Sequence, residues 1–151
     1  ILYIFMKTLV AIVERGKGKN NFSCFCPELL EGNLLAGYGK NAREAMEDIQ
    51  EFYNEVKKFE AEKGNIVPEI SFNWRFDVGA FFDYYPLDVS ATAKFIGVSP
   101  SILRQYVAAL RVPKEKQLAK IKDGIQRLAE ALNCPALIDA PVTSYVGRKS
   151  E

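Results

Sequence analysis

The sequence predicts an α+β protein of two small domains, with strands and one helix in the first half and helices only in the second. Three observations support this fold class. Residues 6–76 hold short apolar runs with the alternation of strands around one segment with helical periodicity. From Gly79 onward only the helical period remains. The length of 151 residues, 48% of them hydrophobic and 26% charged, suits one ordinary domain or two small ones.

Three strands are expected at the start of the chain, over residues 6–13, 21–26 and 33–38. The first two flank a turn-forming run rich in glycine and asparagine, which predicts a hairpin. Met6 followed by Lys7 resembles a natural start, so residues 1–5 are interpreted as an upstream remnant. The apolar start lacks a basic leader and a cleavage site and is too short to span a bilayer, so we interpret it as a strand.

A helix is expected from Asn41 to Lys63, with Asn41 as its N-cap and Glu44 reaching back as in a capping box. One apolar stripe at helical spacing would pack on the sheet: Ala45, Ile49, Phe52, Val56 and Phe59. The opposite face is rich in glutamate and is either solvated or a docking surface for a basic partner. After Pro68, alternation predicts a half-buried fourth strand with Ile70, Phe72, Trp74 and Phe76 on one side.

The second half is expected to form four helical segments, over residues 80–85, 88–96, 100–110 and 114–132. The expected domains are residues 6–77 and residues 79–132, followed by a C-terminal tail at residues 133–151 that forms an arm or is partly disordered.

Residues 88–110 have the ordered pattern of a helix-turn-helix. Ala93 is small where two helices would cross closely, and Gly97 four residues later supplies a sharp turn. Ser99 is placed to cap the second helix, and Pro100 suits its first turn. The wedge between the helices would be filled by Ile96, Val98, Leu103 and Tyr106.

The exposed face of this second helix is expected to meet base edges in the major groove of double-stranded DNA through Ser101, Arg104, Gln105 and Ala108. Phosphate contacts are expected from Ser90, Ser99, Arg111, Lys114 and Lys116. The charge distribution favours this half, because residues 79–151 carry 10 Lys and Arg against 7 Asp and Glu, whereas residues 1–78 carry 10 against 12. The alternative is a helical bundle that serves dimerisation and never touches DNA.

Other chemistry has little support. The chain has no histidine, the commonest general base and metal ligand. Its three cysteines, Cys24, Cys26 and Cys134, are too few for a disulfide framework or a four-ligand zinc site, which favours a reducing, cytoplasmic compartment. No spacing places three carboxylates on one face. We therefore expect no enzyme, no catalytic residue, no cofactor and no metal site. The rival hypothesis is a metal-dependent nuclease.

Aromatic residues gather between the two halves, at Phe81, Phe82, Tyr84 and Tyr85. They are interpreted as a hydrophobic hinge that packs domains or subunits, in preference to a platform that stacks on nucleic acid.

Residues 6–76 resemble the N-terminal domain of HicB-family antitoxins. The resemblance rests on the first strand, the glycine-containing turn, an aromatic-led second strand that ends in Pro27-Glu28-Leu29, and the helix entry Gly39-Lys40-Asn41-Ala42-Arg43-Glu44-Ala45. It implies a partial ribonuclease-H-like βββαβ domain without catalytic carboxylates, followed by a DNA-binding module. Residues 114–121, after Arg111-Val112-Pro113, resemble the Cro/repressor type, so that module is expected to be an all-α helix-turn-helix domain.

The resemblance implies that the first domain binds and masks a HicA-like ribonuclease toxin while the second represses the operon that encodes both. A homo-oligomer, dimer or higher, is expected because a helix-turn-helix reads two half-sites. Assembly would use the helical module with its aromatic hinge, or the strand at residues 70–76 if it lies at a sheet edge. The alternatives are an oligomeric protein-interaction module and a stand-alone transcriptional regulator without a toxin.

Overall fold

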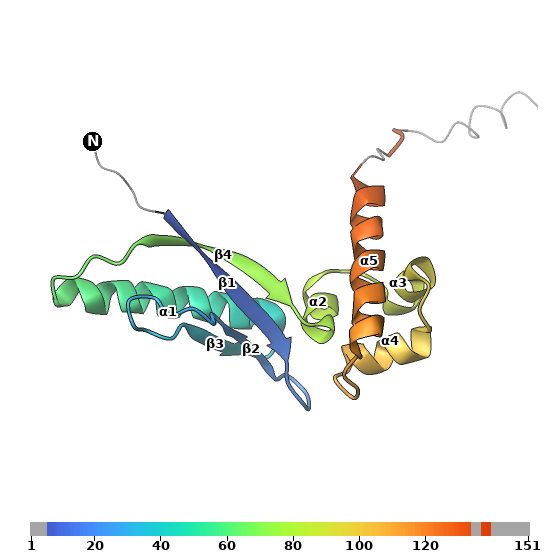
Figure 1. Cartoon of the computed structure of the whole chain (residues 1–151), viewed down its shortest axis with the longest axis horizontal. Coiled ribbons are helices and arrows are strands. Elements are labelled where there is room, and N and C mark those ends of the chain that lie inside the picture. Colours follow the sequence, from blue (N-terminus) through green and yellow to red (C-terminus); the bar gives the residue numbers. More distant parts are fainter. Residues whose placement is uncertain (1–5, 134–136, 140–151) are drawn as a thin grey trace, which may run out of the picture.

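The computed structural model describes residues 6–133 and 137–139 of the chain. A four-stranded mixed sheet and one long helix come first, and four further helices follow beyond the end of the sheet (Figure 1). The predicted α+β class is therefore confirmed. The expectations for residues 1–5, and for all of the tail except Asn133 and residues 137–139, lie outside the described residues. Within the described part of the chain, no helix is long and apolar enough to cross a membrane.

The sheet has the order β3-β2-β1-β4, and all four predicted strands are present. Their bounds are Met6–Arg15 for β1, Phe22–Phe25 for β2, Ala36–Gly39 for β3 and Glu69–Phe76 for β4. β1 and β2 form the predicted antiparallel hairpin, and β4 lies parallel to β1. β3 begins later than expected because Leu30 and Asn33 close a tight turn with two backbone hydrogen bonds of 2.9 and 2.8 Å.

Helix α1, Ala42–Glu62, begins as predicted. The Asn41 side chain accepts a hydrogen bond from the Glu44 N–H at 2.8 Å, and the Glu44 carboxylate accepts one from the Lys40 N–H at 2.7 Å. The Glu44 carboxylate of this capping box therefore bonds to the N–H of Lys40, the residue before the N-cap Asn41. Both bonds satisfy N–H groups near the start of the helix, where no intrahelical acceptor exists.

The predicted apolar stripe of α1 is wrong at two positions. Phe52 is 37% exposed and Phe59 is 53% exposed. The buried face instead includes Tyr53, whose hydroxyl donates to the Pro68 carbonyl at 2.8 Å, and Glu60, whose carboxylate accepts from the Asn65 side chain at 2.7 Å. A tyrosine and a glutamate can be buried here because each has a hydrogen-bond partner.

The first-half core lies between α1 and one face of the sheet. Leu9, Ala11 and Val13 from β1 and Cys24 from β2 are fully buried under α1. β3 approaches most closely, because a Cβ at Gly37 would meet the backbone N of Ile49. On β4 the alternation is confirmed, with its aromatic side chains half-buried against the same core.

The second half contains α2, Val78–Tyr84, α3, Val89–Ile96, α4, Pro100–Val107, and α5, Glu115–Leu132. α4 ends three residues earlier than predicted, because Ala108 is its C-cap and Ala109 has a φ of 59°, in the left-handed region. These helices share a separate hydrophobic cluster that includes Val78, Phe82, Ala93, Ile96, Leu103, Tyr106 and Ile121. The domain boundary near residues 77–79 stays a prediction.

The aromatic residues of α2 pack on the end of β4. Phe76 stacks on Tyr84 with ring centroids 5.4 Å apart and meets Phe81 edge-on at 6.4 Å. Tyr84 packs against the core of the first half, whereas Phe81 packs against the helical cluster. Packing on both sides is the arrangement that a hydrophobic hinge requires.

Candidate nucleic-acid interface

Four residues define the ends of helices α3 and α4 and the tight turn that joins them. Asp88 caps α3 by accepting from the Ala91 N–H at 2.6 Å. Gly97 ends it with a φ of 80°, a conformation that only glycine adopts readily. The Ser99 hydroxyl then accepts from the Ile102 N–H at 3.5 Å, and Pro100 occupies the first turn of α4. The predicted turn, cap and proline are confirmed.

The inner side of the α3–α4 pair is closed by apolar side chains, as predicted. Ala93, Ile96 and Leu103 are at most 1% exposed, and Tyr106 is 9% exposed. α5 crosses over α3 at Gly124, where an added Cβ would lie 2.6 Å from Ile96 Cγ2. The third helix, α5, therefore packs directly on α3.

The outer side of α4 carries the residues that the sequence assigned to base reading. Ser101 and Arg104 are exposed, whereas Gln105 and Ala108 are half-buried. The prediction that Ala108 lies on the helix is wrong, because the helix ends at Val107 and Ala108 is its C-cap. The protruding surface of α4 thus centres on Ser101 and Arg104.

Arg104 is held by a residue of α3. Its Nη1 donates to the Ser90 hydroxyl at 2.7 Å, although the two residues are 14 positions apart. Ser90 lies in the first turn of α3, near the positive end of the helix dipole. The structure therefore brings together an expected base-reading residue and an expected phosphate contact. Ser99, in contrast, uses its hydroxyl as the cap of α4.

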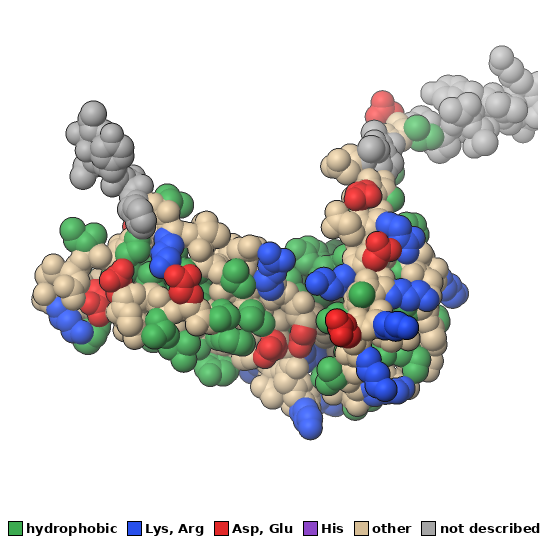
Figure 2. Space-filling model, viewed as in Figure 1, with side chains coloured by type: hydrophobic (Ala, Val, Ile, Leu, Met, Phe, Trp, Pro, Cys, Tyr) green, Lys and Arg blue, Asp and Glu red, His purple; other side chains and the backbone are tan. Residues whose placement is uncertain are grey.

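Basic side chains gather on the helical half of the molecule (Figure 2). Arg111, Lys114 and Lys116 are exposed in the link before α5 and in its first turn. Sequence reasoning missed Lys120, whose Cε is the atom nearest to a Cβ built at Gly97, at 4.0 Å. The spacing of four residues from Lys116 is the signal that could have identified it, because residues at i and i+4 share one helix face.

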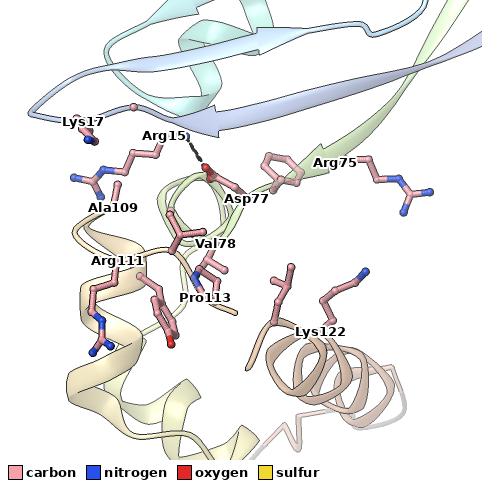
Figure 3. Close-up of a pocket in the computed structure, with 15 residues that line it drawn as sticks. Arg15, Lys17, Arg75, Asp77, Val78, Ala109, Arg111, Pro113 and Lys122 are labelled. Atoms are coloured by element: carbon pink, nitrogen blue, oxygen red, sulfur yellow. Dashed lines mark hydrogen bonds between the residues drawn. The ribbon is translucent and has the colours of Figure 1, made fainter. Parts of the chain in front are cut away.

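A cleft of about 580 Å³ separates this module from the end of the sheet (Figure 3). We call it the junction cleft. Its basic lining residues are Arg15, Lys17, Arg75, Arg111 and Lys122, and Asp77 is the one acidic residue of its lining. Apolar side chains, among them Phe76, Val78 and Tyr106, lie between these cations. The cleft was not anticipated from the sequence, because its walls come from segments far apart in the chain.

Arg15 at the end of β1 connects the sheet directly to α4. Its Nη1 donates to the Val107 carbonyl at 2.8 Å, across 92 positions. The neighbouring Gly79 leaves room for this side chain, since an added Cβ would lie 2.9 Å from Arg15 Cδ and 3.0 Å from the Val107 carbonyl oxygen. A movement of β1 relative to α4 must therefore break or shift this bond.

Asp77 supports the same junction. Its carboxylate accepts from the Ala80 N–H at 2.8 Å, as the cap of α2, and from the Arg15 N–H at 3.1 Å. Burial raises the pKa of Asp77, and the backbone hydrogen bonds oppose that rise. Both hydrogen bonds are local to the junction, so the carboxylate has a structural role.

Among the described residues, no group of three or more His, Cys, Asp or Glu side chains is placed to hold a metal ion. Cys24 and Cys26 are buried free thiols. Burial, with a smaller contribution from a neighbouring charge, raises the pKa of Cys24 to about 12 and that of Cys26 to about 11. Thiols with such pKa values are protonated at neutral pH and serve as core residues.

In comparisons with known proteins, no family model, curated protein or solved structure matches this chain.

Proposed function

We propose that this chain is a DNA-binding antitoxin of the HicB type. In this proposal the helical half is a helix-turn-helix that represses the chain's own operon. The first half is a partial ribonuclease-H-like βββαβ domain that binds and neutralises a HicA-like ribonuclease toxin in the cytoplasm. Neither half is an enzyme, and the assembly is a dimer or a higher oligomer.

The observation that carries the DNA-binding part is the division of α4 into two faces. Leu103 and Tyr106 are buried in the hydrophobic cluster of the helical half, while Ser101 and Arg104 protrude. A helix that reads the major groove needs this division, because one face must hold it on its support while the other approaches base edges. The basic side chains around α4 and α5 supply the attraction to phosphates that accompanies such reading.

Arg104 is the best placed residue for base recognition. Guanidinium groups bond in a bidentate manner to the O6 and N7 atoms of guanine, and Arg104 already projects from α4 under the restraint of Ser90. In the complex, the Ser90 hydroxyl is expected to turn to a phosphate at the first turn of α3 while Arg104 turns to a base.

The toxin-binding part is supported by the order of elements in the first half. β1, β2, β3, α1 and β4 follow one another as the resemblance to HicB-family antitoxins leads one to expect. The hydrogen bond between Arg15 and Val107 offers a route by which an event at the sheet reaches α4. Toxin binding would then alter DNA affinity through the junction.

The DNA-binding part is tested by fluorescence anisotropy with the DNA upstream of the chain's own gene, at two salt concentrations. Wild-type binding should weaken as salt rises, and Arg104→Ala should cost about 1–3 kcal/mol on the specific site only. Lys114→Ala should weaken binding to all sequences about equally. Lys58 is an exposed cation on α1, so Lys58→Ala is the control and should change binding to neither specific nor random DNA. If Arg104→Ala weakened binding to specific and to random DNA by the same factor, Arg104 would have no role in base reading.

The toxin-binding part is tested separately, by co-purification of the chain with the product of the adjacent gene. A complex that suppresses ribonuclease activity supports the antitoxin. DNA binding without any such complex would instead identify a stand-alone transcriptional regulator, and assembly without DNA binding would identify a protein-interaction module.

A further inference from the structure

Strand β4 is an unprotected edge of the sheet. The strand order places it outermost, with β1 as its one neighbour. It is eight residues long and contains neither proline nor lysine, whereas the strand at the other edge, β3, has four residues. Proteins usually shorten edge strands or interrupt them with proline, lysine or bulges, because a free edge recruits another strand. The charged residues of β4, Glu69 and Arg75, lie near its two ends.

The backbone groups that face outward from β4 follow from its pairing with β1. The Asp77 N–H donates to the Val13 carbonyl at 3.0 Å, so the groups of Asn73 and Arg75 also face β1. The N–H and C=O groups of Phe72 and Trp74 therefore face away from the sheet. In the range 6–133, no backbone group from another element bonds to them. They are free to pair with a further strand.

We propose that two copies of this chain pair through β4 in an antiparallel arrangement centred on Phe72, which joins their sheets across a two-fold axis. Such a contact is isologous, because each copy presents the same strand to the other. The proposed function requires two-fold symmetry but leaves the interface open, and this inference supplies one. It stands on the sheet alone and is tested without DNA or toxin.

The outward backbone groups restrict the register. In an antiparallel pair, outward-facing residues must lie opposite outward-facing residues so that their N–H and C=O groups can bond. Arrangements centred on Ser71, Phe72 or Asn73 satisfy this condition. Centring on Phe72 places Phe72 opposite itself and Ile70 opposite Trp74, and it pairs almost the whole strand.

Charge selects among the three arrangements. Centring on Phe72 places Glu69 of each copy opposite Arg75 of the other, on the same face, so two ion pairs form by symmetry. Centring on Asn73 places Glu69 opposite Asp77, which has the same charge. Centring on Ser71 places Trp74 opposite Pro68 and shortens the paired region. Glu69 is already bonded to Lys57 at 2.7 Å, so Arg75 of the second copy would complete a small ionic network.

The register is tested by disulfide trapping in full-length chains that also carry Cys134→Ser. With Phe72 at the centre, residues 71 and 73 of opposite copies form a close pair with Cα atoms about 4.5 Å apart, which a disulfide can bridge. Co-expression of a Ser71→Cys chain with an Asn73→Cys chain should give cross-linked dimers, and neither chain alone should. Cross-linking of Ser71→Cys alone or Asn73→Cys alone would overturn this register, and no cross-linking in any sample would overturn the interface.

The ion pairs are tested by charge reversal and sedimentation of the full chain. Glu69→Arg alone and Arg75→Glu alone should each weaken association about tenfold or more, because two opposite-charge pairs become two like-charge pairs. The double variant should recover wild-type association, and a mixture of the two single variants should form heterodimers. Wild-type association of both single variants, with circular dichroism showing that they are folded, would contradict the proposal.

Discussion

Replacing Gly124 with alanine should destabilise the protein, although the same change in an exposed helix interior is usually stabilising. Alanine is favoured over glycine in a helix by about 1 kcal/mol. At position 124, however, an added Cβ would lie 2.6 Å from Cγ2 and 3.2 Å from Cα of Ile96. Ile96 is 1% exposed and cannot move into solvent. Overpacking costs about 1–3 kcal/mol, and the gain in helix propensity offsets about 1 kcal/mol of it, so the expected net loss of unfolding free energy is up to about 2 kcal/mol.

The assay is urea unfolding followed by far-ultraviolet circular dichroism. Ala129→Gly, on the exposed side of the same helix, is the control and should lose about 1 kcal/mol through helix propensity alone. A Gly124→Ala protein that unfolds at higher urea than wild type would refute the reasoning, because α5 would then not pack on α3 at Gly124.

Three further predictions concern single groups. Gly97→Ala should lower the free energy of unfolding by about 1–2 kcal/mol through backbone strain alone, since outside its chain neighbours the atom nearest to the added Cβ lies 4.0 Å away. Gly97→Asn should lose less, because asparagine tolerates the left-handed conformation better than alanine. Equal urea midpoints for both variants and wild type would contradict this. In a Cys134→Ser protein, Cys24 and Cys26, with pKa values of about 12 and 11, should resist a thiol reagent at pH 8 until urea unfolds the chain; rapid labelling of the native protein would show that they are accessible. The pKa of Glu60 lies below its ordinary value of 4.5, chiefly because the Asn65 side chain donates to it, so its contribution to stability is present above that pH and is lost as pH falls through the folded-state pKa. Glu60→Gln should therefore flatten the acid side of the curve of Tm against pH, and an acid limb identical to that of wild type would rule out this linkage.

Local chemistry made part of this fold predictable. Asn41, Gly97 and Ser99 each determine the backbone within four residues of their own position, through a cap or a left-handed turn. The alternation of β4 likewise depends only on the two-residue period of a strand. Features that depend only on residues a few positions apart can therefore be predicted from a single sequence.

Features that depend on distant neighbours were missed. The burial of Tyr53 and Glu60 in place of Phe52 and Phe59 depends on how α1 rotates over the sheet, and Pro68 and Asn65 are the partners that make it favourable. Gly79 has no helical reason to be glycine and is explained by the Arg15 side chain beside it. The junction cleft and the hydrogen bond between Arg15 and Val107 likewise depend on segments far apart in the chain.

The candidate site was predicted in its local pattern but not in its contacts. The exposed positions of Ser101 and Arg104 follow from helical periodicity once Leu103 and Tyr106 are assigned to the core. The bond between Arg104 and Ser90 depends on the crossing of α3 and α4, which no spacing reveals. The early end of α4 depends on the left-handed backbone of Ala109, a residue type that seldom adopts it.

Methylation protection of the operator DNA tests the central claim most directly, because guanine N7 lies in the major groove. With wild-type protein, protected guanines should appear in two half-sites about 34 Å apart, and Arg104→Ala should lose that protection while a folded helical module remains. Protection that persists in Arg104→Ala, or binding that leaves every guanine N7 reactive, would contradict the claim that α4 reads DNA through its exposed face.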